Sequence, residues 1–194
     1  MDKVEQLRQQ ALNSWYFAVA IGMVLTGLSY GAAYLMVGPY AVTQVEIWGV
    51  VLNYACVYLT ARRRISCWPF GIVAVIFLGV LFWQIGLYAS LALHIGYFFP
   101  IQFWGWYRWK YGGEQRTELP VTTIRPIEWL VVIGLLITAS LAVYNLNIFF
   151  QGESPLADTL IMTLSITAQY LLTHKKLESW FIWIGVNVLA SIVY

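Results

Sequence analysis

The residues of this sequence that could recognise a ligand are neutral amides and aromatic rings set inside long apolar stretches. Near the C-terminus, Trp180, Trp183 and Asn187 are spaced i, i+3 and i+7, so a helix would present them on one face. Gln169, on the preceding apolar stretch, follows Ser165 at helical spacing. An amide without a partner in hydrocarbon costs roughly 4–8 kcal/mol. These groups must therefore face protein or a watery cavity.

A further polar face is expected on the apolar stretch 88–107. Its members lie at helical spacing or beside that face: His94, Tyr97, Phe98, Gln102 and Trp106. Together the faces predict a cavity lined by aromatic rings and amides. Such a cavity suits a flat ring with amide or hydroxyl groups, or a ring with a delocalised positive charge held over indole faces.

Each candidate also has a purely structural interpretation. Trp180 is placed to sit at a membrane interface, Asn187 to join neighbouring helices, and His94 to be a packed histidine. Gln84 and Tyr88 form another i, i+4 pair, and with Trp68 they are candidates of second rank.

Charged and metal-binding chemistry is absent from the apolar interiors. No Asp, Glu, Lys or Arg lies deep within an apolar stretch, which argues against proton or sodium coupling. The two histidines and the cysteines Cys56 and Cys67 show no metal-ligand or nucleophile spacing. We therefore expect no enzyme activity, no cofactor and no metal.

Composition places these stretches in a membrane. Of the 194 residues, 60% are hydrophobic and only 10% are charged, with a mean hydropathy of +0.69. A soluble surface or a disordered chain needs more charge, and a net charge of +2 does not fit a nucleic-acid partner. We predict an all-α polytopic membrane protein whose partner is the lipid bilayer. Seven spans are expected at 15–37, 47–61, 68–86, 88–107, 128–149, 156–173 and 179–194.

The basic residues indicate the orientation. With the N-terminus inside, all 11 Lys and Arg residues fall in inner segments and none in outer ones. We therefore predict that the N-terminus is cytoplasmic. Residues 108–127 become a cytoplasmic linker, and Trp104 and Trp109 become interface residues.

The sequence also contains a weak internal repeat. With an offset of 112, segment 51–72 resembles segment 163–184, and the basic turn Arg62–Arg64 falls on His174–Lys176. The identical pairs are Leu52 and Leu164, Tyr58 and Tyr170, Leu59 and Leu171, Trp68 and Trp180, and Ile72 and Ile184. Copies separated by an even number of spans run in the same direction, as in transporters with parallel repeats.

Two stretches resemble the Pnu family of vitamin-precursor transporters. The first comprises Trp68-Pro-Phe-Gly-Ile72, Phe82-Trp-Gln-Ile-Gly-Leu-Tyr-Ala-Ser90 and Trp104-Gly-Trp-Tyr-Arg-Trp109. The second is Glu178-Ser-Trp-Phe-Ile-Trp-Ile-Gly-Val-Asn187. The resemblance implies a SWEET-like fold of two three-helix bundles joined by a linking helix. It also implies facilitated uptake of nicotinamide riboside across the bacterial inner membrane, with trapping by cytoplasmic phosphorylation.

The resemblance assigns the ligand to particular residues. Trp180, Trp183 and Asn187 match the family's aromatic and amide site, and Gln169 with the face of 88–107 would complete the pocket. His94 and Gln102 depart from the Gln and Asn that relatives tend to carry there. Thiamine or another vitamin therefore remains an alternative ligand, and a ligand-sensing receptor without transport is a second alternative. A homo-oligomer is left open.

The repeat and the resemblance together predict a division of the chain. Residues 1–44 would carry an extra transmembrane helix, and 45–109 would form the first three-helix repeat. Residues 110–150 would form the linker and linking helix, and 151–194 an incomplete second repeat. Because the partner of span 88–107 would lie beyond residue 194, we expect the 194 residues to be part of a longer protein.

Overall fold

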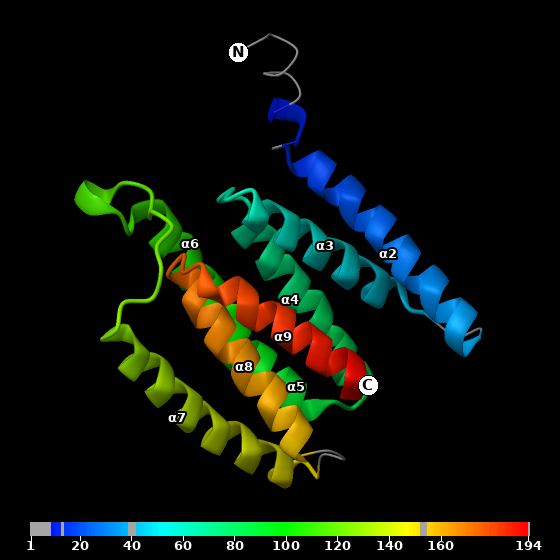
Figure 1. The fold of residues 1–194 in the computed structure, drawn as a ribbon. Coiled ribbons are helices and arrows are strands. Elements are labelled where there is room, and N and C mark those ends of the chain that lie inside the picture. Colours follow the sequence, from blue (N-terminus) through cyan, green and yellow to red (C-terminus); the bar gives the residue numbers. More distant parts are fainter. Residues whose placement is uncertain (1–8, 13, 39–41, 152–154, 194) are drawn as a thin grey trace. The chain divides into compact units, whose positions relative to one another are not determined.

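The computed structural model describes residues 9–12, 14–38, 42–151 and 155–193, which form helices and connecting loops (Figure 1). Within these ranges, strand-like pairing is limited to an isolated parallel bridge between Thr122 and Lys176. The chain divides into two compact units, Met1–Gly86 and Leu87–Tyr194. The all-helical architecture expected from the composition is therefore confirmed.

Four of the described helices are long and apolar enough to cross a membrane: Trp15–Met36, Cys67–Gln84, Glu128–Phe149 and Leu156–Thr173. Helices also lie over the other three predicted ranges, one of them interrupted by a wider turn. Of these, the C-terminal helix is apolar but shorter. That all seven cross the membrane stays a prediction.

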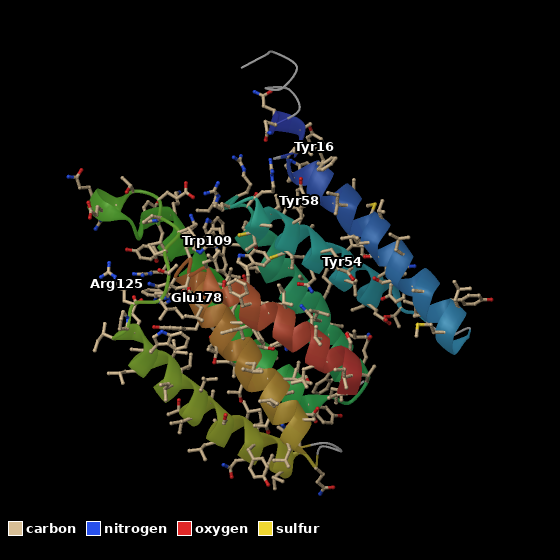
Figure 2. The ribbon with its side chains drawn as sticks, in the orientation of Figure 1. Tyr16, Tyr54, Tyr58, Trp109, Arg125 and Glu178 are labelled. Carbon is tan, nitrogen blue, oxygen red and sulfur yellow. The ribbon has the colours of Figure 1, made fainter. Side chains whose placement is uncertain are left out.

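Three long helices in the described part of the first unit pack in chain order: α2 (Trp15–Val37), α3 (Gln44–Ala61) and α4 (Cys67–Gln84). At Gly22, α2 approaches α3 so closely that an added Cβ would lie 2.4 Å from the carbonyl oxygen of Val51. Tyr54 on α3 extends towards α2, where its hydroxyl lies 2.9 Å from that of Ser29 (Figure 2). Close backbone approach and this polar contact hold the two helices together.

The second unit is arranged around one central helix. It begins with a continuous helical segment made of α5 (Tyr88–Leu93), the π-helical turn η1 (His94–Phe98) and α6 (Phe99–Tyr111). A loop containing the short helix η2 (Glu114–Arg116) leads to α7 (Glu128–Phe149), α8 (Pro155–Thr173) and α9 (Glu178–Val193). The helices α6, α7 and α9 all pack against α8 (Figure 1). The buried side chains of α8 therefore lie among three neighbouring helices.

Pro100 explains the π-helical turn. Proline has no N–H, and its ring clashes with the carbonyl four residues earlier, here that of Gly96. The helix widens just before it, and the N–H of Phe99 donates to the carbonyl oxygen of His94, five residues back. A wider turn rotates all later residues about the helix axis. The polar face expected along 88–107 therefore cannot continue unbroken through this turn.

The turns that connect α3 to α4 and α8 to α9 have the same geometry. Arg63 and Lys175, which are 112 residues apart, both have left-handed backbones, with φ of 55° and 50°. In each turn the next residue donates its N–H to the carbonyl oxygen five residues back, at 2.8 Å in the first unit and 2.9 Å in the second. The starts of α7, α8 and α9 also fall within one residue of those of α2, α3 and α4 after the same shift.

Candidate functional site

Trp180, Trp183 and Asn187 lie along one side of α9, as their spacing predicts. Both indoles are half-buried and the Asn187 side chain is exposed, whereas the adjoining face with Ser179 and Val186 is buried. The Asn187 amide nitrogen donates to the carbonyl oxygen of Trp183 at 2.9 Å. Its Oδ1 has no hydrogen bond among the described residues. One hydrogen-bond acceptor therefore stands beside two indole rings.

Two buried glutamines lie on α6 and on α8. The helix α8 packs against both α6 and α9. Gln102 on α6 is 7% exposed and Gln169 on α8 is 6% exposed. Neither side-chain amide makes a hydrogen bond to another part of the chain that the structure describes. The donors and acceptors of each amide are therefore available for a ligand or water.

The π-helical turn holds the aromatic candidates of this segment. The Tyr97 hydroxyl donates to the carbonyl oxygen of Ile166 at 2.8 Å, which ties the turn to α8. Phe98 is buried, with its ring centroid 5.0 Å from that of His94 and 5.4 Å from that of Tyr97. The His94 Nδ1 lies 2.8 Å from the carbonyl oxygen of Ser90. These rings form one aromatic cluster, and Tyr97 and His94 are both anchored to backbone.

The predicted face of this segment is wrong at its far end. Phe98 and Gln102 are buried with Gly105 and Trp109, but Trp106 is exposed. Trp106 leaves this face because each i, i+4 step advances about 40° around a regular α-helix, so two such steps from Phe98 bring it to the exposed side of α6.

The second-rank candidates lie on two helices, α4 and α5, that belong to different units. Gln84 ends α4, and Tyr88 begins α5 in the other unit, so they are not an i, i+4 pair on one helix as expected. Gly86, with φ of 77°, breaks the helix between them. Tyr88 lies against Phe150, with ring centroids 6.2 Å apart. Trp68 is 2% exposed in the core of the first unit.

Sequence reasoning missed a polar cluster at the turn between α8 and α9, here called the hairpin cluster. It contains Trp109, Glu118, Glu128, Lys175, Lys176 and Glu178. Trp109 is not an interface residue as expected: it is 2% exposed, and its Nε1–H donates to the carbonyl oxygen of Leu172 at 3.0 Å. The sequence did contain a signal for this cluster, because the linker carries acidic residues and the turn carries the pair Lys175-Lys176. Trp109 and Glu178 lie at the same end of the second unit (Figure 2).

Among the described residues, no three His, Cys, Asp or Glu side chains gather closely enough to hold a metal ion. The arrangement offers aromatic faces and neutral amides instead, which bind flat polar rings.

Residues 43–194 match the nicotinamide mononucleotide transporter family. The chain belongs to this family. It is 27% identical to the nicotinamide riboside transporter PnuC of Escherichia coli over 183 residues, which cover 81% of this chain and 76% of that protein. It is 27% identical to PnuC of Neisseria mucosa over 145 residues, covering 72% of this chain and 55% of that protein.

The fold also has a counterpart among solved structures. The crystal structure of the vitamin B3 transporter PnuC superposes with a TM-score of 0.67 at 20% identity, covering 91% of this chain and 76% of that chain. The family expected from the tryptophan motifs is therefore confirmed, and the protein is a multi-pass membrane protein of a transporter family. The roles of the individual site residues stay predictions.

Proposed function

We propose that this protein carries nicotinamide riboside across the bacterial cytoplasmic membrane by facilitated diffusion and that cytoplasmic phosphorylation traps the product. Family membership and the curated PnuC relatives support the substrate. The observation that carries the proposal is the pair of buried amides, Gln102 and Gln169, without protein partners. Gln169 lies on α8 and Gln102 lies on α6, which packs against α8; the helix with Trp180 and Trp183, α9, packs against α8 as well. A pyridinium ring with a carboxamide and a ribose needs aromatic faces and neutral hydrogen-bonding groups.

Passive rather than coupled transport, and no catalytic role, follow from the same chemistry. Ion-coupled carriers place ionisable groups inside the membrane. The candidate residues here are aromatic, amide or imidazole groups. Nothing among them is an acidic residue that could bind a coupling cation.

The test is uptake of labelled nicotinamide riboside into proteoliposomes that contain a nicotinamide riboside kinase and ATP. Accumulation of the phosphorylated product with this protein, and not with empty liposomes, supports the proposal. Thiamine is titrated in parallel against the purified protein, because both ligands carry a cationic ring. If the protein bound thiamine and did not bind nicotinamide riboside, thiamine would be the proposed substrate instead. Binding without flux would indicate a ligand-sensing receptor.

We further propose seven spans, a cytoplasmic N-terminus and a parallel repeat, with boundaries that differ from those expected above. The matching helix starts and turn geometry favour repeats at 15–84 and 128–193, joined by the helical segment 88–111. In this division the helix at 15–37 belongs to the first repeat rather than standing outside it. The offset of 112 residues is unchanged.

Accessibility of single cysteines tests this topology. In a background without Cys56 and Cys67, the variants Arg63→Cys and Gln115→Cys should react only with reagents on the cytoplasmic side. Gln151→Cys should react from the outside. Labelling of Arg63→Cys and Gln151→Cys from the same side would refute the arrangement.

A further inference from the structure

The turn between α8 and α9 places a lysine where the backbone favours glycine. Lys175 has a φ of 50°, in the left-handed region that costs residues with a Cβ and costs glycine nothing. Arg63 has the same conformation in the first unit. The two side chains differ in surroundings, because Arg63 is exposed and Lys175 is only 5% exposed. A lysine buried at a strained position suggests that its side chain has a role.

The Lys175 side chain joins three segments of the second unit. Its Nζ lies 2.7 Å from Oε1 of Glu118 on the linker and 4.4 Å from the ring centroid of Trp109 on α6. The Trp109 carbonyl oxygen in turn accepts the N–H of Leu119 at 3.1 Å. Burial of an ammonium group requires such partners, since an unpaired charge is costly to bury.

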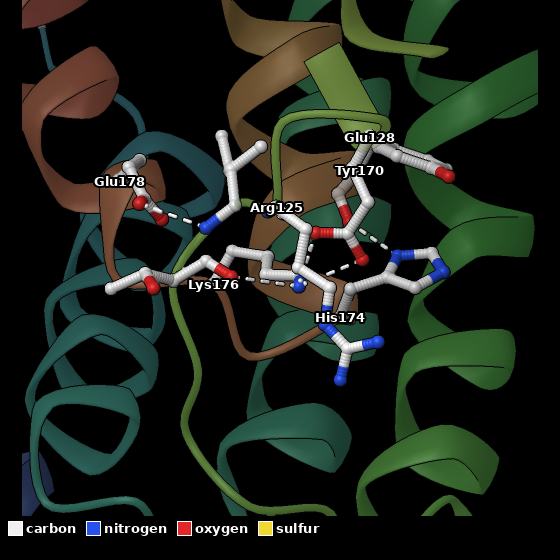
Figure 3. A network of polar contacts seen from close by, with 8 residues as sticks. Arg125, Glu128, Tyr170, His174, Lys176 and Glu178 are labelled. Atoms are coloured by element: carbon white, nitrogen blue, oxygen red, sulfur yellow. Dashed lines mark hydrogen bonds and ion pairs between the residues drawn. The ribbon is translucent and has the colours of Figure 1, made fainter. Parts of the chain in front are cut away.

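Further contacts fasten the linker to the turn and to the start of α9. The Lys176 Nζ lies 2.7 Å from Oε2 of Glu128 and donates to the carbonyl oxygen of Thr123 at 3.0 Å. Glu178, the first residue of α9, accepts the N–H of Ile124 through Oε1 at 2.9 Å. Figure 3 shows these contacts converging on the turn from the linker and from α7. The backbone adds two hydrogen bonds through Thr122, which pairs with the turn on both sides.

We propose that Lys175 is a positioning residue for ligand binding, because it holds the linker and α6 against the turn from which α9 starts. Trp180 lies two residues into α9 and Trp183 lies one turn further. A small rotation at Glu178 therefore moves both indoles. This inference rests on the proposed function, since it assigns the hairpin cluster the task of holding the ring-binding face in place before the ligand arrives. Preorganised side chains need less ordering on binding and so bind more tightly.

The matched pair Lys175→Gly and Arg63→Gly tests the proposal in the full-length protein. Both replace a left-handed residue by glycine and so relieve the same backbone strain. Lys175→Gly should weaken nicotinamide riboside binding about tenfold by calorimetry, the size expected when one or two side chains lose their preorganisation. It should also speed hydrogen exchange at the amides of Thr122 and Leu177. Arg63→Gly should change neither quantity.

Conservative variants separate positioning from simple stability. Lys175→Arg keeps a cation that can pair with Glu118 and lie over Trp109, so it should restore most of the affinity. Glu118→Gln leaves the turn intact and should weaken binding in the same direction as Lys175→Gly, and it replaces that variant if the glycine protein does not fold.

Each outcome decides a different claim. Wild-type affinity in both Lys175→Gly and Glu118→Gln, with wild-type protein binding the ligand, would overturn the positioning role. Equal loss in Arg63→Gly would overturn it too, because the effect would then belong to the turn and not to the cluster. If the wild-type protein bound no nicotinamide riboside, the proposed function would fail. The exchange measurement would still show whether Lys175 holds the linker.

Discussion

Replacing Gln169 by leucine should have opposite effects on stability and on ligand binding. Gln169 is buried on α8, and its amide makes no hydrogen bond to the rest of the described chain. Leucine has a similar volume and no polar group to desolvate. The free protein should therefore gain stability, and the ligand should lose a partner. A glutamine whose amide stabilised the free protein would give the opposite result for stability.

The magnitudes follow from the cost of an unsatisfied amide. Full burial of such a group without a partner costs about 1–3 kcal/mol, and contact of the amide with water reduces this cost. For a chain of this length each kcal/mol shifts the unfolding midpoint by about 2–4 °C. On the binding side, a ligand group left unpaired costs about 1–3 kcal/mol, which is roughly five- to a hundredfold in affinity.

The assay is thermal unfolding of the purified protein with and without nicotinamide riboside, combined with calorimetric titration. We expect Gln169→Leu to raise the midpoint of the free protein by several degrees and to lose most of the shift caused by ligand. Thr167→Val is the matched control. Thr167 is also buried on α8, but its hydroxyl already donates to the carbonyl oxygen of Thr163 at 3.0 Å. Its replacement should leave ligand affinity unchanged.

Two results would refute this reasoning. A lower midpoint for Gln169→Leu would mean that the amide stabilises the free protein. An unchanged dissociation constant would place Gln169 away from the ligand, whatever the stability. The same pair of measurements on Gln102→Leu then tells whether α6 shares the site.

The remaining predictions concern the indole of Trp183, the coupling of uptake to ion gradients, and the pH dependence of stability. Trp183→Ala should weaken binding roughly five- to a hundredfold, because a stacking contact contributes about 1–3 kcal/mol; the exposed Trp104→Ala is its control, and equal affinity in both would make Trp183 a packing residue. Uptake should not respond to a proton or sodium gradient, and accumulation of unmodified substrate against its own gradient would contradict facilitated diffusion. Burial, with Arg108 and Lys176 nearby, lowers the pKa of His174, although its hydrogen bond to the Tyr170 carbonyl acts the other way. Folding therefore favours neutral His174, so stability should fall as the pH drops below about 6.5, the ordinary pKa. His174→Gln should flatten that loss, and an identical pH profile in the variant would show that His174 does not cause it.

Hydropathy and helical spacing were enough to predict much of the fold. The helices at 15–37 and 128–149 have the predicted boundaries. A long apolar segment in lipid must form a helix to pair its backbone groups, and the polar residues at its ends mark where the helix stops. The π-helical turn was not predicted, although Pro100 carried the signal. A proline inside a helical pattern can produce a kink, a break or a wider turn, and the choice depends on what packs nearby. As a consequence, His94 was placed on the same regular helical face as Phe98 and Gln102, although the turn lies between them.

Only those features of the candidate site that lie within a single helix could be predicted from the sequence. The shared face of Trp180, Trp183 and Asn187 depends on local periodicity, so spacing alone found it. The lack of protein partners for Gln102 and Gln169 depends on which helices surround α8, and no spacing in the sequence contains that information. Trp109 was misjudged for the same reason. An indole near a membrane interface and an indole under a buried lysine look alike in a sequence.

The proposed repeat shows where the two units differ chemically. With the offset of 112, the positions of Trp180, Trp183 and Asn187 correspond to Trp68, Gly71 and Val75. These first-unit residues are all buried, and the last two have no amide or aromatic group to offer. The shared positions Cys67 and Ser179, by contrast, are buried in both units and serve packing. In the proposed repeat the two copies therefore share buried core positions, whereas the candidate ring-binding residues Trp183 and Asn187 have no aromatic or amide counterpart in the first copy.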